Sequence, residues 1–303
     1  MKLAVNHSRP AARLRREGAI DFDLFKCPAW PDMIDEALGE GPSYIHFPLK
    51  IGVGRGVINS ETGREPDWSL LDTLRARTQT PFLNLHLTPT RSDLSRHSAE
   101  FLNPEEEETL IRDCIRDMKE AADRCGRESL LLENNSDDLG QAFPLFLRPE
   151  LISRIVEESG CGFLLDLSHA CLAADFLGRD RQTYINALPL KRLGELHITG
   201  IQIFGPEWID TLRREGIEES VIGRYAGRPM DHLPLLPEDW DVFTWAAGEI
   251  RQGRWGTPWA VTFEYGGISP LWAALTDEEV LKTQVPRLQK IMGGSTDPEK
   301  ALT

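Results

Sequence analysis

The chain has 303 residues, of which 41% are hydrophobic, and its 34 Lys and Arg against 48 Asp and Glu give a formal net charge of −14. This length fits one large α/β barrel or two ordinary domains. The acidic balance excludes nucleic acid and anionic membrane as expected partners, because both are polyanions. The five cysteines lack Cys-x-x-Cys spacing, so we expect neither a disulfide framework nor a thiolate zinc site. Residues 1–10 carry no long apolar segment and no stretch is apolar enough to span a membrane, so we expect a cytoplasmic protein.

The first third of the chain alternates strand and helix patterns. Residues 2–7, 43–48 and 81–89 are predicted strands, and residues 10–17, 30–38 and 67–77 are predicted helices. A glycine-rich loop, residues 51–56, follows the second predicted strand. The second and third strands carry His46 and His86 near their ends.

Residues 104–125 form the clearest predicted helix. Asn103 can cap it, Pro104 suits its first position, and the glutamates at 105–108 complement its dipole. One face is apolar, including Cys114, and Gly126 ends the helix. The glutamate run is therefore a solvated helix start rather than a metal site.

The remainder continues the alternation. Strands are predicted at residues 129–135, 162–166, 193–200 and 258–267, and helices at 148–159, 170–178, 182–188, 237–250 and 276–292. Residues 201–225 resemble an insertion with a helical stretch at 206–215, and residues 230–234 follow it in the place of a seventh strand. The count and the size predict a single (β/α)8 TIM barrel over residues 1–292, followed by a flexible tail at 293–303. A doubly wound sheet is the alternative, although no Gly-x-Gly-x-x-Gly or P-loop signature follows a strand.

The sequence GFLLDLSHA, residues 162–170, joins a strand of buried character to Asp166 and His169. A carboxylate at the end of a parallel strand occupies the position of barrel active sites. The structural alternative is that Asp166 caps the following helix. The same pattern of acid or histidine at a strand end recurs along the chain, which favours a functional role.

The recurring residues predict a metal site. Close carboxylates repel one another unless a cation compensates them. A single catalytic metal takes about three or four protein ligands, so this number of candidates indicates two or three ions, with Glu133 as a natural bridge. Imidazole and carboxylate donors suit iron, manganese, zinc or cobalt. The candidate ligands are His46, His86, Glu133, Asp166, His169, His197, Asp231, His232 and Glu264.

Five motifs together resemble the multinuclear non-haem iron-dependent oxidases, formerly a domain of unknown function within the xylose-isomerase-like barrels. They are LLEN at 131–134, GCGFLLDLSH at 160–169, ELHITG at 195–200, DHLP at 231–234 and FEYGG at 263–267. The resemblance is strongest over residues 130–200. It departs from the family at Met230, where an acid is expected with Asp-x-His spacing, and at His169, where many members carry Asn.

The resemblance implies a TIM barrel with two or three iron ions, with zinc or manganese as alternatives. It also implies oxygen-dependent modification of a ribosomally made peptide, at a cysteine or the C-terminal residue, or of a small molecule, with a substrate-delivery partner protein in some members. We assign catalysis to Glu133, Asp166 and His197, and substrate contacts to Asn134, Asn135, Lys50 and Arg55.

Three other functions fit the same residues. A dinuclear or trinuclear zinc hydrolase would use metal-bound hydroxide, but the chain has no basic stripe for a DNA substrate. A sugar isomerase or epimerase needs fewer ligands than are present. A non-catalytic metal-binding partner subunit would not need a complete ligand set.

Overall fold

The structure is a computed structural model, which describes residues 1–89, 94, 103–136 and 143–294. The described chain forms two compact units, residues 1–43 with 196–303 and residues 44–195. The predicted tail lies outside the described residues from position 295 onward. Strands β3 (Ser43–His46) and β9 (Leu193–Ile198) each contain a boundary between the units. Among the described residues, no helix is both long enough and apolar enough to cross a membrane.

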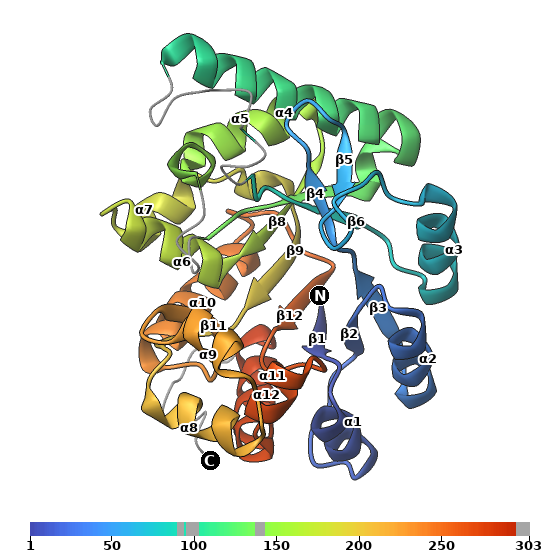
Figure 1. Cartoon of the computed structure of the whole chain (residues 1–303), viewed down its shortest axis with the longest axis vertical. Helices are drawn as coiled ribbons and strands as arrows, with labels where there is room; N and C mark the ends of the chain where they lie inside the picture. The colour runs from blue at the N-terminus through green and yellow to red at the C-terminus, as the bar shows by residue number, and fades with distance from the viewer. Residues whose placement is uncertain (90–93, 95–102, 137–142, 295–303) are drawn as a thin grey trace. The chain divides into compact units, whose positions relative to one another are not determined.

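Residues 44–195 contain a parallel sheet covered by helices. In this unit β6 pairs in parallel with β4 and β7, β7 pairs with β8, and β4 turns back through an antiparallel hairpin to β5. Helices α4 and α5 run side by side in Figure 1. The elements are β4 (Leu49–Ile51), β5 (Val57–Asn59), α3 (Trp68–Thr78), β6 (Leu83–His86), α4 (Pro104–Cys125), η1 (Arg127–Ser129), β7 (Leu130–Glu133), η2 (Pro144–Leu147), α5 (Pro149–Ser159), β8 (Gly162–Asp166), α6 (Leu167–Phe176), α7 (Arg181–Asn186) and η3 (Leu190–Arg192).

Buried apolar side chains explain why this sheet forms. Leu131 and Leu132 of β7 and Phe163 to Leu165 of β8 are almost completely buried, as expected for strands covered on both faces. The Leu131 side chain packs over Gly162, where an added Cβ would lie 2.6 Å from Leu131 Cδ2. Glycine at this position therefore lets β7 and β8 pack closely.

Helix α4 confirms the prediction for residues 104–125. The Asn103 side chain accepts from the backbone N–H groups of Glu105 and Glu106, and the Glu106 carboxylate accepts from the Asn103 N–H. This reciprocal capping box satisfies amide groups that a helix start leaves unpaired. Cys114 and Met118 lie fully buried on the predicted apolar face.

Residues 1–43 with 196–303 contain β1 paired in parallel with both β2 and β12. They also contain a two-stranded antiparallel sheet, β10 with β11, which shares an apolar cluster with α8, α9 and α11. Figure 1 shows these three helices close to β11. The elements are β1 (Lys2–Asn6), α1 (Arg9–Arg16), β2 (Leu24–Pro28), α2 (Pro31–Glu40), β10 (Gly200–Ile203), α8 (Pro206–Arg214), α9 (Glu219–Tyr225), β11 (Pro229–Leu233), α10 (Pro237–Arg251), β12 (Ala260–Phe263), α11 (Pro270–Leu275) and α12 (Glu278–Met292).

Two sequence predictions need correction here. Strand β2 was not predicted, because the charged Lys26 interrupts its short apolar run. Residues 230–234, predicted in the place of a seventh strand, belong to β11, which pairs antiparallel with β10. Gly200 permits this hairpin, since an added Cβ there would lie 1.9 Å from the Pro234 carbonyl oxygen.

Candidate metal centre

The register of the sheet brings two predicted ligands together in residues 44–195. His86 and Glu133 end neighbouring strands β6 and β7 and are direct register partners. Asp166 ends the next strand, β8, two residues beyond Leu164, the partner of Glu133. Because side chains alternate between the faces of a strand, Leu164 and Asp166 project to the same face. Parallel pairing therefore places these three donors at one edge of the sheet.

The first group of donors is His46, His86 and Glu133. The two imidazole Nε2 atoms are 3.0 Å apart, and Glu133 Oε2 lies 3.4 Å from His46 Nε2 and 3.1 Å from His86 Nε2. Metal–ligand bonds of about 2.1 Å place adjacent ligands roughly 3.0–3.4 Å apart in octahedral or tetrahedral geometry. The three atoms thus have the spacing of ligands around one ion.

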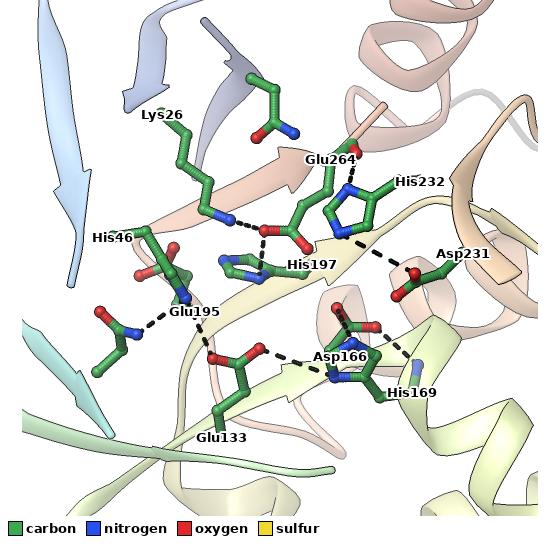
Figure 2. A network of polar contacts seen from close by, with 12 residues as sticks. Lys26, His46, Glu133, Asp166, His169, Glu195, His197, Asp231, His232 and Glu264 are labelled. Carbon is green, nitrogen blue, oxygen red and sulfur yellow. Dashed lines mark hydrogen bonds and ion pairs between the residues drawn. The ribbon is translucent and has the colours of Figure 1, made fainter. Parts of the chain in front are cut away.

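The second group is Glu133, Asp166 and His169. Glu133 Oε1 lies 3.8 Å from His169 Nδ1, and Asp166 Oδ2 lies 3.7 Å from His169 Nε2 (Figure 2). The oxygens of Asp166 differ in their surroundings: Oδ1 accepts from the His169 backbone N–H at 2.8 Å and caps α6. Oδ2 is buried and accepts no hydrogen bond from the described residues. Asp166 is therefore a helix cap, as the structural alternative predicted, with one oxygen left for a cation.

Backbone carbonyls set the tautomers of two histidines in these two groups. His86 Nδ1 lies 2.8 Å from the Leu49 carbonyl oxygen, and His169 Nδ1 lies 3.1 Å from the Asn134 carbonyl oxygen. Because a carbonyl only accepts, each Nδ1 carries the proton and each Nε2 keeps its lone pair, which is the arrangement of metal-binding histidines. His46 differs, since the Asn84 amide donates to its Nε2 at 2.9 Å. A bound ion would replace that hydrogen bond.

In residues 1–43 with 196–303, His197 and Glu264 lie together (Figure 2). His197 Nδ1 is 3.0 Å from Glu264 Oε1, and the Lys26 ammonium group forms an ion pair with the same oxygen. The side chains of His197, Glu264 and Lys26 are 0%, 4% and 10% exposed, so the charges are compensated away from water. Sequence reasoning missed Lys26, because it lies inside an unpredicted strand rather than at the end of one.

Asp231 and His232 form a weaker pair. His232 Nε2 is 4.0 Å from Asp231 Oδ1, its Nδ1 donates to the Glu264 carbonyl oxygen at 2.6 Å, and its ring packs on Trp272 at a centroid distance of 4.9 Å. His232 has a φ of 59°, in the left-handed region, where strain of this kind is typical of functional positions. Neither residue belongs to a three-donor group among the described residues.

The four predicted substrate-binding residues have different surroundings. The Asn134 side-chain amide is buried. It donates to the Asp166 carbonyl oxygen at 2.9 Å and accepts from the Asp166 backbone N–H at 2.9 Å. Asn135 is buried. Lys50 pairs in register with His86. Arg55 is exposed in the β4–β5 loop, where its Nε donates to the Gly52 carbonyl oxygen. Asn134 thus fixes the end of β8, and contact with substrate stays a prediction for all four.

Comparison with proteins of similar sequence identifies relatives. The chain is 26% identical over 203 residues to a UPF0276 protein of Anaeromyxobacter sp. (strain Fw109-5), which covers 66% of this chain and 70% of that protein. It is 36% identical over 74 residues to a UPF0276 protein of Paraburkholderia phytofirmans, in a match that spans 24% of each.

Solved structures with similar folds establish the architecture. A D-psicose 3-epimerase solved with D-fructose matches with a TM-score of 0.52 at 10% identity, over 97% of this chain and 100% of that one. A xylose isomerase domain-containing protein from Salmonella typhimurium LT2 matches with a TM-score of 0.51 at 12% identity, over 96% of each chain. The fold is therefore α/β, of the xylose-isomerase-like TIM-barrel type, which confirms the predicted class.

More than half of the chain matches the model of one protein family. The model of the RiPP precursor modification enzymes MbnB/TglH/ChrH matches residues 58–236, which include Glu133, Asp166, His169, His197 and His232. This agrees with the resemblance carried by the sequence motifs. The chain therefore belongs to the MbnB/TglH/ChrH family of RiPP precursor modification enzymes.

Proposed function

We propose that this protein is a multinuclear non-haem iron-dependent oxidase that uses O2 to modify a ribosomally made peptide, at a cysteine or its C-terminal residue. The observation that carries the proposal is the position of Glu133, which belongs to both three-donor groups of residues 44–195. A carboxylate shared in this way is suited to bridge two ions. Membership of a peptide-modifying family supports a peptide substrate.

The donors fit a redox metal. Imidazole nitrogen and carboxylate oxygen are typical ligands of non-haem iron. The buried Asp166 Oδ2, which accepts no hydrogen bond from the described residues, is an acceptor that a cation would satisfy. Bound iron would supply the one-electron and O2 chemistry that side chains lack. His197, Asp231, His232 and Glu264, in residues 1–43 with 196–303, are also proposed metal ligands, and we propose two or three iron ions for each chain.

The burial of the donors determines where substrate can approach. Glu133 and Asp166 are 2% and 0% exposed, whereas the side chains of His46, His86 and His169 are 15%, 25% and 18% exposed. The carboxylates thus form the base, and the imidazoles form the side that faces solvent. A substrate approaching from that side would meet the ions without disturbing the buried charges.

We further propose roles for the chain's own groups. The Leu49 and Asn134 carbonyls hold the His86 and His169 rings in their ligating tautomer. Lys26 holds one oxygen of Glu264. Asn135 and Lys50 are proposed to orient the substrate, and a partner protein is proposed to deliver it. Glu133, Asp166 and His197 are the proposed catalytic ligands.

The test compares iron with zinc. Metal-free protein is reconstituted anaerobically with either ion and given a panel of synthetic cysteine-bearing peptides, and O2 uptake and peptide mass are followed. We expect O2-dependent modification with iron alone. Modification at an equal rate with zinc and without O2 would refute the oxidase and support the zinc hydrolase.

A further inference from the structure

Residues 44–195 also form a pocket that contains none of the predicted metal ligands. It has a volume of about 530 Å³ and is formed by the β4–β5 loop, the segment that leads into α3 and one face of α4. The β4–β5 hairpin contacts α4, as Figure 1 shows. Small-molecule sites span roughly 300–1,000 Å³, so the pocket is large enough for a ligand. We call it the Asp117 pocket, after its buried acid.

The Asp117 carboxylate has one satisfied and one unsatisfied oxygen. Asp117 is only 1% exposed, and its Oδ2 accepts from the Gly54 backbone N–H at 2.8 Å. Oδ1 is buried and accepts no hydrogen bond from the described residues. The backbone of Gly56 and the charge of Arg116 also stabilise the carboxylate, but only in part, because the Arg116 guanidinium pairs with Asp113 at 2.8 Å and approaches Glu120 at 3.9 Å. A buried acceptor of this kind is costly unless a donor reaches it.

Arginine and tryptophan surround this acid. Arg55, Arg116 and Arg124 line the pocket, and the Arg124 guanidinium lies over the Trp68 ring, 4.9 Å from its centroid. Arg55 and Arg124 are exposed at the rim, whereas Asp117 lies at the base. Guanidinium groups bind carboxylates through paired hydrogen bonds. Glu65 and Glu120, both exposed, also line the pocket, which therefore offers a buried anion at the base and groups of both charges at the rim.

We propose that the Asp117 pocket binds a zwitterion, with its ammonium group on the Asp117 carboxylate and a carboxylate on the rim arginines. A simple cation would meet three guanidinium groups, and a simple anion would meet the buried carboxylate, so a ligand that carries both charges complements the lining best. Burial raises the pKa of Asp117 to about 6, which leaves the group charged at neutral pH. A free α-amino acid has both charges, and so does a peptide whose N-terminal ammonium group lies close to an acidic side chain or to its own C-terminus.

Calorimetric titration of the purified metal-bound protein at neutral pH tests the proposal. The probes are L-glutamate, L-alanyl-L-glutamate and N-acetyl-L-alanyl-L-glutamate, which lacks the ammonium group. We expect the free dipeptide to bind at least about tenfold more tightly than its acetylated form, as for loss of a hydrogen bond to a charged group. Equal affinity for glutamate and the dipeptide identifies a free amino acid as ligand, and a clear preference for the dipeptide identifies a peptide end.

Variants locate the binding group. Asp117→Asn keeps an acceptor for the Gly54 N–H but removes the charge, and we expect it to bind both dipeptides equally weakly. Asp123→Asn, an exposed position on the same helix outside the pocket, is the matched control and should bind as the wild type does. The proposal is overturned if the wild type binds neither glutamate nor the free dipeptide at millimolar concentration, or if Asp117→Asn retains the preference for the free dipeptide. Both results are independent of the proposed oxidase activity.

Discussion

Replacement of Glu133 by Gln should remove more than one metal ion, because both three-donor groups in residues 44–195 use its carboxylate. These groups contain two carboxylates, Glu133 and Asp166, against four positive charges for two divalent ions. The Glu133→Gln variant keeps only one of these carboxylates, that of Asp166. Loss of a ligand should lower the affinity for each ion by at least the ~10–100-fold that is typical of changes to residues that support the ligands. That corresponds to about 1.4–2.7 kcal/mol for each ion.

His86→Ala is the matched comparison, because His86 belongs to only one of the two groups. Both variants are reconstituted anaerobically with ferrous iron and desalted, and bound iron is counted by plasma mass spectrometry. We expect Glu133→Gln to lose at least one more ion than His86→Ala. Far-ultraviolet circular dichroism checks that both variants remain folded. Equal iron loss in the two variants, or a full complement in Glu133→Gln, would refute the shared-carboxylate interpretation.

Four further predictions follow from particular contacts. His232→Ala should cost about one ion and leave the others bound; unchanged iron content would make this histidine structural or substrate-facing. Lys26→Met removes the cation that forms an ion pair with the buried Glu264 carboxylate and leaves only His197 beside that oxygen, so metal-free protein should lose about 3–5 kcal/mol of unfolding free energy and recover part of it with ferrous iron; a melting temperature that is unchanged without metal contradicts this. Burial raises the pKa of Asp117 from 3.8 to about 6. The folded protein therefore binds this proton more tightly than the unfolded chain, and stability from this group falls by up to about 3 kcal/mol between about pH 4 and pH 6. Urea unfolding of Asp117→Asn at a series of pH values should not show that decrease in stability. The same pH dependence in the variant as in the wild type would contradict the prediction. Asn103→Ala removes the α4 capping box and should cost about 1 kcal/mol in urea unfolding; no loss would mean that the cap does not stabilise α4.

Local sequence features predicted those parts of the fold that depend on neighbouring residues. The capping residues and apolar face of residues 104–125 predicted α4 with its bounds, because helix ends and helical periodicity are local properties. The run of apolar residues before Asp166 predicted β8, because a strand buried on both faces needs no alternation. The family motifs lie on these regular elements, which explains why the fold class could be predicted correctly.

Other features depend on contacts between distant residues, and only the tertiary structure decided them. Strand β2 has a lysine in a short apolar run, and the ion pair of Lys26 with Glu264 is what makes its burial tolerable. Asp231 and His232 belong to an antiparallel hairpin because β11 pairs with β10 across an insertion. Asp166 both caps a helix and keeps a buried acceptor oxygen. The sequence by itself determined which residue types stand at the strand ends, whereas the pairing of strands determined that Glu133 lies within reach of two sets of donors. The physical reason is that strand register is set by hydrogen bonds and packing between segments far apart in the chain.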